Sequence, residues 1–216
     1  MKEAKNMSYN HRILDLKYRI NGLVPKNTEL NNLDIIKEVI FNKQELNTIS
    51  KFILKKEDYI KSLGPSIYNG TSKDSLTGRY NVYNFLNSEI GALLKNKIFK
   101  FLLKNKINLP ASIQCWANTF RKEEGISLHC HSDPNDYTKF KCLNIFIKGD
   151  PNIGTYFIID KRPVKHISKP GEIMLFNSDL KHYVPKNLSN DIRISIALDV
   201  YEGILLKDNV RFYHWI

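Results

Sequence analysis

Side chains that bind metals occupy alternate positions in the segment Leu-His-Cys-His-Ser-Asp that begins at Leu128. His129, His131 and Asp133 would point to one face if a β-strand continued through them, because alternate residues of a strand share a face. Another histidine, His182, precedes a later apolar residue. Two histidines and one carboxylate with open coordination positions form the ligand set of non-haem Fe(II) oxygenases. His-x-Asp alone is common by chance, so a metal site is predicted only from its combination with His182 and with the residues described next.

An arginine interrupts an apolar segment downstream, 192–200, which is rich in β-branched residues and predicts a strand. Arg193 alternates with Ile192 and Ile194, so its side chain would face opposite to theirs. If the isoleucines face one layer of a sandwich, Arg193 projects toward the other side, which can be a cavity. A guanidinium binds a carboxylate in bidentate fashion and keeps its charge, so we expect Arg193 to hold an anion such as a dicarboxylate.

The first half of the chain predicts mainly helices. The segment Ile13–Ile20 alternates like a strand, and Leu33–Ile40 fits either a strand or the start of a helix. Apolar residues recur at helical spacing over Lys43–Leu63. A second amphipathic helix is predicted to begin at Asn87 and to end before Pro110.

After Pro110 the periodicity changes to that of short strands separated by Gly, Pro, Asn and Asp. The expected strands are Ile113–Phe120, Leu128–His131, Cys142–Ile147, Thr155–Ile159, Ile173–Phe176 and Ile192–Val200. Short strands at this spacing indicate a sandwich or barrel. We therefore expect an α+β fold in a single domain, 1–216, in which a mainly helical part, 1–110, packs on a jelly roll, 111–216.

A polar, aromatic and glycine-punctuated segment, Tyr68–Tyr83, predicts an ordered loop. Such a loop either crosses a site or is a simple surface connection, and the sequence leaves both open. In the first case Arg79, Tyr80 and Tyr83 are candidate substrate contacts. Together with the lysine excess, they favour a small polar substrate that carries an anionic group over a lipid.

The composition limits the class of protein. The chain has 216 residues and a net charge of +11, which fits a solvated lysine-rich surface, an anionic substrate or a nucleic-acid surface. It has no RNP-type aromatic motif, paired-cysteine zinc module or glycine-rich phosphate loop, so nucleic acid is not an expected partner. Three cysteines, no signal peptide and no apolar run long enough for a membrane span predict a reduced, soluble, cytoplasmic protein. Nothing in the sequence indicates an oligomeric state.

Together, these residues carry a family resemblance. From Trp116 to Tyr201 the chain resembles the 2-oxoglutarate and Fe(II)-dependent dioxygenases, and its His-x-His segment with Pro-Gly-Glu-Ile-Met-Leu-Phe-Asn-Ser-Asp-Leu-Lys-His resembles a microbial and phage subgroup. By position, His182 matches the distal iron ligand. Arg193 matches the arginine that binds the far carboxylate of 2-oxoglutarate, and Ser195 matches its hydroxyl partner.

The resemblance leaves the first ligand pair open. The general family pattern favours His131 with Asp133, whereas the subgroup keeps His129 and His131. It also implies a double-stranded β-helix, or cupin-like jelly roll, and the cofactors Fe(II) and 2-oxoglutarate. A small-molecule substrate would react with O2, most simply by hydroxylation with release of succinate and CO2. A side chain in the third ligand position leaves no vacancy for a halide, which disfavours halogenation. Asn144 and Tyr156 are candidate cosubstrate contacts.

Two other classes compete. A cupin-type metal enzyme or binding protein that does not use 2-oxoglutarate would have a similar fold, because Gly125, Asp136, the histidine pair and the Pro-Gly segment before His182 also resemble cupin motifs. Such a protein does not need Arg193 followed by Ser195, so this pair favours the oxygenase. A non-catalytic ligand-binding domain is the third class, and metal analysis would separate it from the others.

Overall fold

Two antiparallel β-sheets form the body of the protein. This computed structural model describes residues 35–64, 76–80, 82–131, 140–205 and 212–216, so the strand predicted at Ile13–Ile20 lies outside the described residues. The larger sheet has the order β1-β7-β4-β9-β2-β10, and the smaller has the order β3-β8-β5-β6. The strands of the larger sheet are β1 (Ile36–Val39), β7 (Glu172–Asn177), β4 (Phe140–Lys148), β9 (Arg193–Glu202), β2 (Ala111–Phe120) and β10 (Tyr213–Trp215). Those of the smaller are β3 (Ile126–His129), β8 (His182–Val184), β5 (Thr155–Ile159) and β6 (Arg162–His166).

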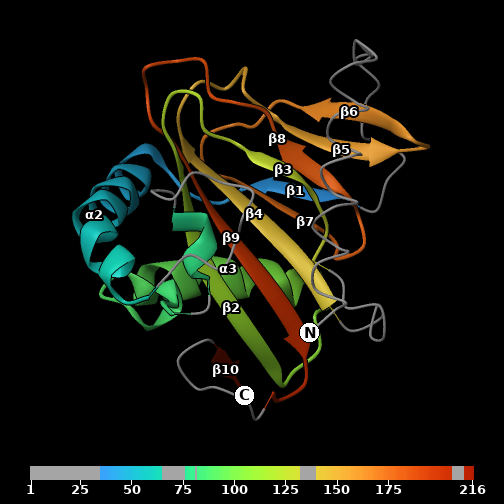
Figure 1. Ribbon diagram of the computed structural model, residues 1–216. Coiled ribbons are helices and arrows are strands. Elements are labelled where there is room, and N and C mark those ends of the chain that lie inside the picture. The colour runs from blue at the N-terminus through green and yellow to red at the C-terminus, as the bar shows by residue number, and fades with distance from the viewer. Residues whose placement is uncertain (1–34, 65–75, 81, 132–139, 206–211) are drawn as a thin grey trace, which may run out of the picture.

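Two helices cover one face of the larger sheet (Figure 1). Helix α2 (Lys43–Ser62) begins at Asn42, whose side chain accepts from the backbone N–H of Glu45 while the Glu45 carboxylate accepts from Asn42. This capping box satisfies two backbone donors that the first helical turn leaves without partners. A short 3-10 helix, Phe85–Asn87, leads into helix α3 (Gly91–Lys104).

The main hydrophobic core lies between these helices and the larger sheet. It joins residues of α2 and α3 to the apolar side chains of β2, β4, β7 and β9. From β9 the contributors are Ile194, Ile196, Leu198 and Val200, all fully buried. Because side chains alternate along a strand, the intervening residues of β9 face the smaller sheet.

Strand β9 lies in the middle of the larger sheet and pairs with β2 on one side and β4 on the other. Asn118 of β2 lies opposite Ser195, and Asn144 of β4 lies opposite Ala197. The inner face of β9 is thus flanked by polar side chains from both neighbouring strands. This register places the polar residues of three strands on one surface between the sheets.

The predicted helices and the expected strands after Pro110 are confirmed, with shifted boundaries. Leu33–Ile40, which the sequence left open, contains strand β1. The expected strand through Leu128–His131 is wrong in its bounds, because β3 ends at His129 and His131 follows it. The described part of the predicted loop Tyr68–Tyr83 includes a 3-10 helix, Leu76–Arg79. Strands β6, β8 and β10 were not expected; they are short and mix polar with apolar residues, so they lack a clear alternation.

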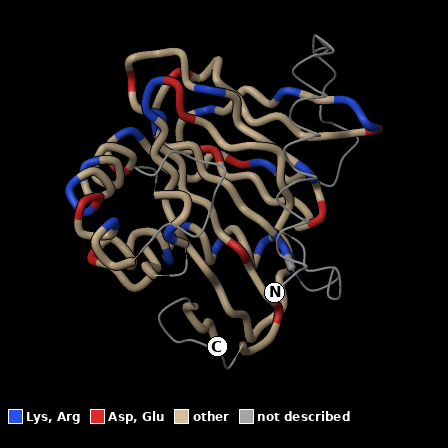
Figure 2. Tube along the Cα trace, in the orientation of Figure 1, with Lys and Arg blue, Asp and Glu red and all other residues tan. Residues whose placement is uncertain are grey.

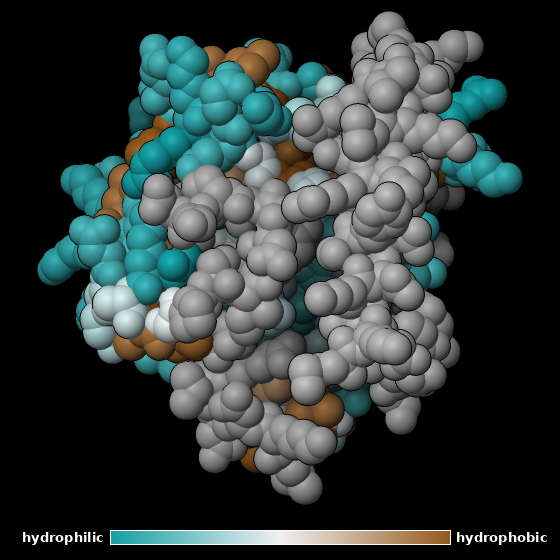
Figure 3. Space-filling view, viewed as in Figure 1, coloured by the Kyte–Doolittle hydropathy of each residue, from teal (hydrophilic) through white to brown (hydrophobic). Residues whose placement is uncertain are grey.

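Basic residues gather on the outside of α2 and along the β5–β6 hairpin (Figure 2). The surface over α2 is correspondingly hydrophilic, as Figure 3 shows at the left. None of the described helices is long and apolar enough to cross a membrane. The lysine excess thus lies mainly on solvated surfaces of the described chain rather than in the space between the sheets.

Candidate metal and anion site

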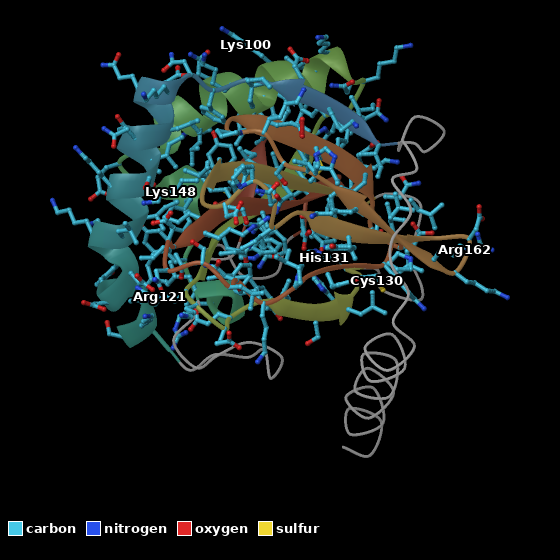
Figure 4. The ribbon with its side chains drawn as sticks, turned by 90° about the horizontal axis from the view of Figure 1, so that it is seen from above. Lys100, Arg121, Cys130, His131, Lys148 and Arg162 are labelled. Atoms are coloured by element: carbon cyan, nitrogen blue, oxygen red, sulfur yellow. The ribbon has the colours of Figure 1, made fainter. Side chains whose placement is uncertain are left out.

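Three histidines converge between the two sheets. His129 ends β3 directly opposite His182 of β8, and their ring centroids are 4.3 Å apart. The ring centroid of His131 lies 5.1 Å from that of His129 and 5.3 Å from that of His182. The backbone N–H of His131 donates to the Ser178 carbonyl at 2.9 Å. One nitrogen of each ring lies within 4.8 Å of the others, which places the three histidines within reach of one metal ion. In Figure 4, His131 lies in the interior, whereas Arg162 lies at the far tip of the β5–β6 hairpin.

Hydrogen bonds fix which nitrogen of each histidine faces the cluster. The Nδ1 atom of His129 bonds the Ser127 carbonyl at 2.8 Å, and Nδ1 of His182 bonds the Leu180 carbonyl at 2.9 Å. Since a carbonyl oxygen only accepts, both Nδ1 atoms carry the proton. Nδ1 of His131 bonds a carboxylate oxygen of Asp199 at 2.7 Å. Nε2 is therefore the metal-facing atom in all three rings, as in metal sites whose ligands are oriented by their other nitrogen.

The electrostatic environment differs between these histidines. Burial and, to a smaller extent, the nearby His131 lower the pKa of His182 to about 3, so His182 is neutral at neutral pH. Burial also opposes protonation of His131, but the charge and hydrogen bond of Asp199 outweigh it and raise its pKa above the ordinary value. Neutral His182 suits metal binding, because a ligating imidazole must offer its lone pair.

Asp199 lies on the inner face of β9, opposite Cys142 of β4. The Cys142 thiol is 3.5 Å from the same carboxylate oxygen that His131 bonds. Burial and the neighbouring carboxylate raise the pKa of this thiol well above its ordinary value, so it remains a neutral donor. Asp133, the other carboxylate that the sequence singled out, lies outside the described residues.

Arg193 is a buried cation at the opposite end of the same strand face. Its side chain is 1% exposed, and its guanidinium packs on the rings of Phe120 and Phe146 at 5.9 and 5.4 Å. Nε donates to the Ile153 carbonyl at 3.2 Å and Nη1 lies 3.5 Å from the Ser195 hydroxyl. Nη2 has no hydrogen-bond partner among the described residues.

The charge of Arg193 is not neutralised within the described chain. No described carboxylate forms an ion pair with it. Burial lowers its pKa to about 10, so the guanidinium stays protonated at neutral pH. Gly149 lets the neighbouring turn approach closely, since its φ is +127° and a Cβ there would lie 2.8 Å from the Arg193 Cα. A buried cation held in this way lacks only an anion.

Several buried polar atoms of the described residues have no hydrogen-bond partner. The Asn118 amide donates to Ser195 Oγ at 3.3 Å, while Asn118 Oδ1, Asn144 Oδ1 and Thr155 Oγ1 are buried with no hydrogen-bond partner in the described structure. Buried polar groups are nearly always hydrogen-bonded, so a cluster of unpaired ones points to a polar ligand.

A cavity of about 270 Å³ connects these groups. Its lining includes His129, His131, His182, Ser195, Asn118, Asn144, Thr155, Cys130, Asp199, Tyr80, Trp116 and Tyr201. Trp116 stacks on His131 at 5.8 Å and contacts Tyr80 at 5.9 Å, so an aromatic wall lies beside the histidines. Arg193 lies next to Ser195 rather than on the cavity surface.

Other residues that the sequence singled out lie elsewhere. Tyr156 stacks on Tyr183 at 4.9 Å and does not line the cavity. Arg79 is buried in the 3-10 helix Leu76–Arg79, and Tyr83 packs on Phe85 at 4.9 Å. The structure thus brings Tyr80 to the cavity, but not Arg79 or Tyr83.

The sequence reasoning missed Asn118, Thr155, Trp116 and Asp199. A signal for Asp199 was present, because Ser195 and Asp199 lie two and six positions after Arg193 in an apolar strand, and even spacings share one face. The same period links Trp116 and Asn118 in β2. The assignment of Arg193 to the inner face, applied to the whole strand, would have included Asp199.

Solved structures of other proteins share the fold of this chain. No protein-family model and no curated protein sequence matches the chain. Among solved structures, HygX from Streptomyces hygroscopicus, determined with nickel, 2-oxoglutarate and hygromycin B bound, is similar at a TM-score of 0.59 and 10% identity, over 81% of this chain and 85% of that one. A Pseudomonas putida prolyl-4-hydroxylase matches at 0.58 and 10% identity, over 81% and 95%. SnoK, a non-heme alpha-ketoglutarate-dependent carbocyclase from nogalamycin biosynthesis, matches at 0.58 and 10% identity, over 83% and 87%. The chain therefore shares the fold of these proteins.

Proposed function

We propose that this protein is an Fe(II)- and 2-oxoglutarate-dependent oxygenase built on a single-domain double-stranded β-helix. One arrangement carries the proposal: three histidines offer ring nitrogens within 4.8 Å of one another, and the buried Arg193, which has no described anionic partner, lies beyond Ser195 of the same cavity. A metal site next to a site for a carboxylate is what a chelating dicarboxylate requires. The core shared by helices and sheet supports one domain.

The residues present fit an iron ion. His131, His182 and His129 would hold it, with Nδ1 of each ring bonded to an acceptor that orients the ring. Imidazole nitrogens suit iron, and three protein ligands leave open coordination positions. Asp133 remains the alternative to His129, as the sequence pattern predicts.

The residues also fit 2-oxoglutarate. Arg193 would bind the distal carboxylate, with the Ser195 hydroxyl at 3.5 Å from Nη1 as a second contact. The Thr155 hydroxyl, which has no partner among the described residues, can donate a hydrogen bond and lines the space that the rest of the molecule would occupy. The structures of HygX with 2-oxoglutarate bound support this cosubstrate.

The bound iron and 2-oxoglutarate would supply the oxidising power that amino-acid side chains lack. The chain's own residues would position the reactants. Trp116 and Tyr80 form the wall beside His131 and would orient a small polar substrate, for which we propose hydroxylation. The apolar residues of the lining, such as Phe120 and Phe176, would keep water from the reacting centre.

A cupin-type metal protein is the second candidate. The three-histidine cluster alone would suit it equally well. The buried charge of Arg193 favours the oxygenase, because a buried cation with no described anionic partner is costly unless a ligand neutralises it.

Turnover of 2-oxoglutarate tests the proposal. The purified chain, supplied with Fe(II), 2-oxoglutarate and O2, should release succinate, and small polar metabolites should be screened for those that accelerate it. The His182→Ala variant serves as the inactive control. Release of succinate that is equal in both proteins, or none under any condition, would reject the oxygenase and leave the cupin-type candidate.

A further inference from the structure

The carboxylate of Asp199 differs from the acceptors of the other two histidines. His129 and His182 each donate Nδ1–H to a neutral backbone carbonyl, whereas His131 faces a buried carboxylate at 2.7 Å. Both side chains of this pair are largely buried: 13% of the His131 side chain and 10% of the Asp199 side chain are exposed. Of the three Nδ1 hydrogen bonds, that of His131 thus goes to a carboxylate and those of His129 and His182 go to carbonyls.

Asp199 has no other charged partner in the described chain. Its second contact is the neutral Cys142 thiol at 3.5 Å, and no described lysine or arginine forms an ion pair with it. A buried carboxylate whose hydrogen-bond donors are neutral is unfavourable unless positive charge lies close by. A divalent cation on Nε2 of His131 would supply that charge through the ring.

When the three described histidines are the ligands, the ligand set itself lacks negative charge. Three imidazoles are neutral donors, whereas the usual two-histidine, one-carboxylate set brings one negative charge to the metal. A carboxylate that accepts a hydrogen bond from a ligating histidine makes that histidine a stronger donor. The Asp199–His131 pair thus places a negative charge one ring away from the metal position.

We propose that Asp199 is a positioning residue that supplies, through His131, the negative charge missing from a three-histidine metal site. The inference rests on the metal site of the proposed function, but not on the identity of the cosubstrate or on turnover. It predicts that the charge of Asp199, and not only its ability to accept a hydrogen bond, sets the affinity for a divalent metal.

A comparison of two substitutions separates charge from geometry. Asp199→Asn keeps the size of the side chain and an oxygen that can accept from Nδ1–H, but it removes the charge. Asp199→Ala removes both. We expect Asp199→Asn to weaken Co(II) binding, measured by titration calorimetry in the absence of 2-oxoglutarate, by about 10- to 100-fold. The Asp199→Ala variant should lose at least as much.

The chain offers a matched control. His166 and Glu172 form a second histidine–carboxylate pair, 2.6 Å apart and 8% and 9% exposed, and neither residue belongs to the metal cluster. Glu172→Gln should leave Co(II) affinity unchanged. Equal losses in Asp199→Asn and Glu172→Gln would attribute the effect to general destabilisation and overturn the proposal, as would wild-type affinity in Asp199→Asn or a wild-type chain that binds no metal.

The wild-type protein provides a test that needs no variant. In the Zn(II)-loaded chain, labelled with nitrogen-15 at histidine, the Nδ1 proton of His131 should resonate downfield of those of His129 and His182. A hydrogen bond to a carboxylate is stronger than one to a carbonyl, which is the reason for this order. Three equivalent Nδ1 protons would overturn the proposal. Metal affinity that depends on Asp199 without any succinate release would leave it standing and reject the oxygenase instead.

Discussion

The two ends of the inner face of β9 carry opposite buried charges with different degrees of internal compensation. Asp199 receives hydrogen bonds from His131 and Cys142. Arg193 has a carbonyl and a hydroxyl as partners, and its Nη2 has none among the described residues. Both residues are buried, Asp199 with 7% and Arg193 with 1% of the whole residue exposed.

The contrast separates a site assembled by the chain from one that needs a ligand. At the Asp199 end, a carboxylate orients a histidine whose other nitrogen joins the cluster. At the Arg193 end, a charge that is expensive to bury has no anion from the described chain. Substitutions at the Asp199 end should therefore weaken mainly metal binding. Substitutions at the Arg193 end should weaken mainly carboxylate binding.

Removing a histidine should have the largest effect. His131→Ala or His182→Ala deletes a ligand, and we expect Co(II) binding and turnover to fall below detection, by more than the roughly 100-fold that outer partners of a ligand contribute. Titration calorimetry and succinate release measure the two quantities. Full activity in either variant would break the assignment.

The third ligand is decided by a paired comparison. If the three-histidine cluster holds the metal, His129→Ala should lose most of the Co(II) affinity, and Asp133→Ala should lose little. The same titration measures both, and the reverse order would assign the position to Asp133.

Arg193→Met, at the other end of the inner face of β9, should weaken the binding of 2-oxoglutarate. Loss of a buried bidentate partner costs about 2 to 5 kcal/mol, or tens- to thousands-fold in affinity for 2-oxoglutarate. Affinity for Co(II) should stay near the wild-type value. Binding of 2-oxoglutarate to the Co(II)-loaded protein measures the effect, with the exposed Arg162→Met as control for the loss of one positive charge. Equal losses of metal and 2-oxoglutarate affinity would erase the distinction between the two ends.

Ser195→Ala should produce a smaller change at the same end. The Ser195 hydroxyl lies 3.5 Å from Arg193 Nη1 and accepts from the Asn118 amide at 3.3 Å. A hydrogen bond of this kind contributes about 0.5 to 1.5 kcal/mol, so 2-oxoglutarate affinity should fall by roughly two- to tenfold. An unchanged dissociation constant would exclude the hydroxyl as a cosubstrate contact.

Glu57→Gln should lower the free energy of unfolding and should have little effect on the binding of metal or of 2-oxoglutarate. Burial opposes ionisation of Glu57, but hydrogen bonds from Arg121, at 2.8 and 2.9 Å, and from Lys61 outweigh it and hold its pKa below the ordinary value. A carboxyl with a lowered pKa in the folded state stabilises above its unfolded pKa of about 4.3, and this stabilisation disappears as the pH falls through the folded pKa. The variant should lose about 1.5 to 3 kcal/mol at pH 7, and the difference should shrink below about pH 4. Denaturant unfolding at both pH values measures it; a constant difference would contradict the linkage.

Local patterns in the sequence were enough to predict both helices, most of the strands and several of the chemical groups. Helical spacing predicted α2, since every third or fourth residue had to face the same core. Alternation around Arg193 placed its side chain opposite to that of Ile194, because a strand has a period of two. These patterns are local, so the chain itself contains the information.

Which distant groups meet depends on the tertiary structure. The strand expected to carry three metal ligands on one face ends at His129, and His131 reaches the cluster through a backbone hydrogen bond to Ser178 and the carboxylate of Asp199. Likewise, Tyr80 lines the cavity while the adjacent Arg79 does not. Such contacts join residues separated by tens of positions, and they depend on strand register and packing, which no local period of the sequence specifies.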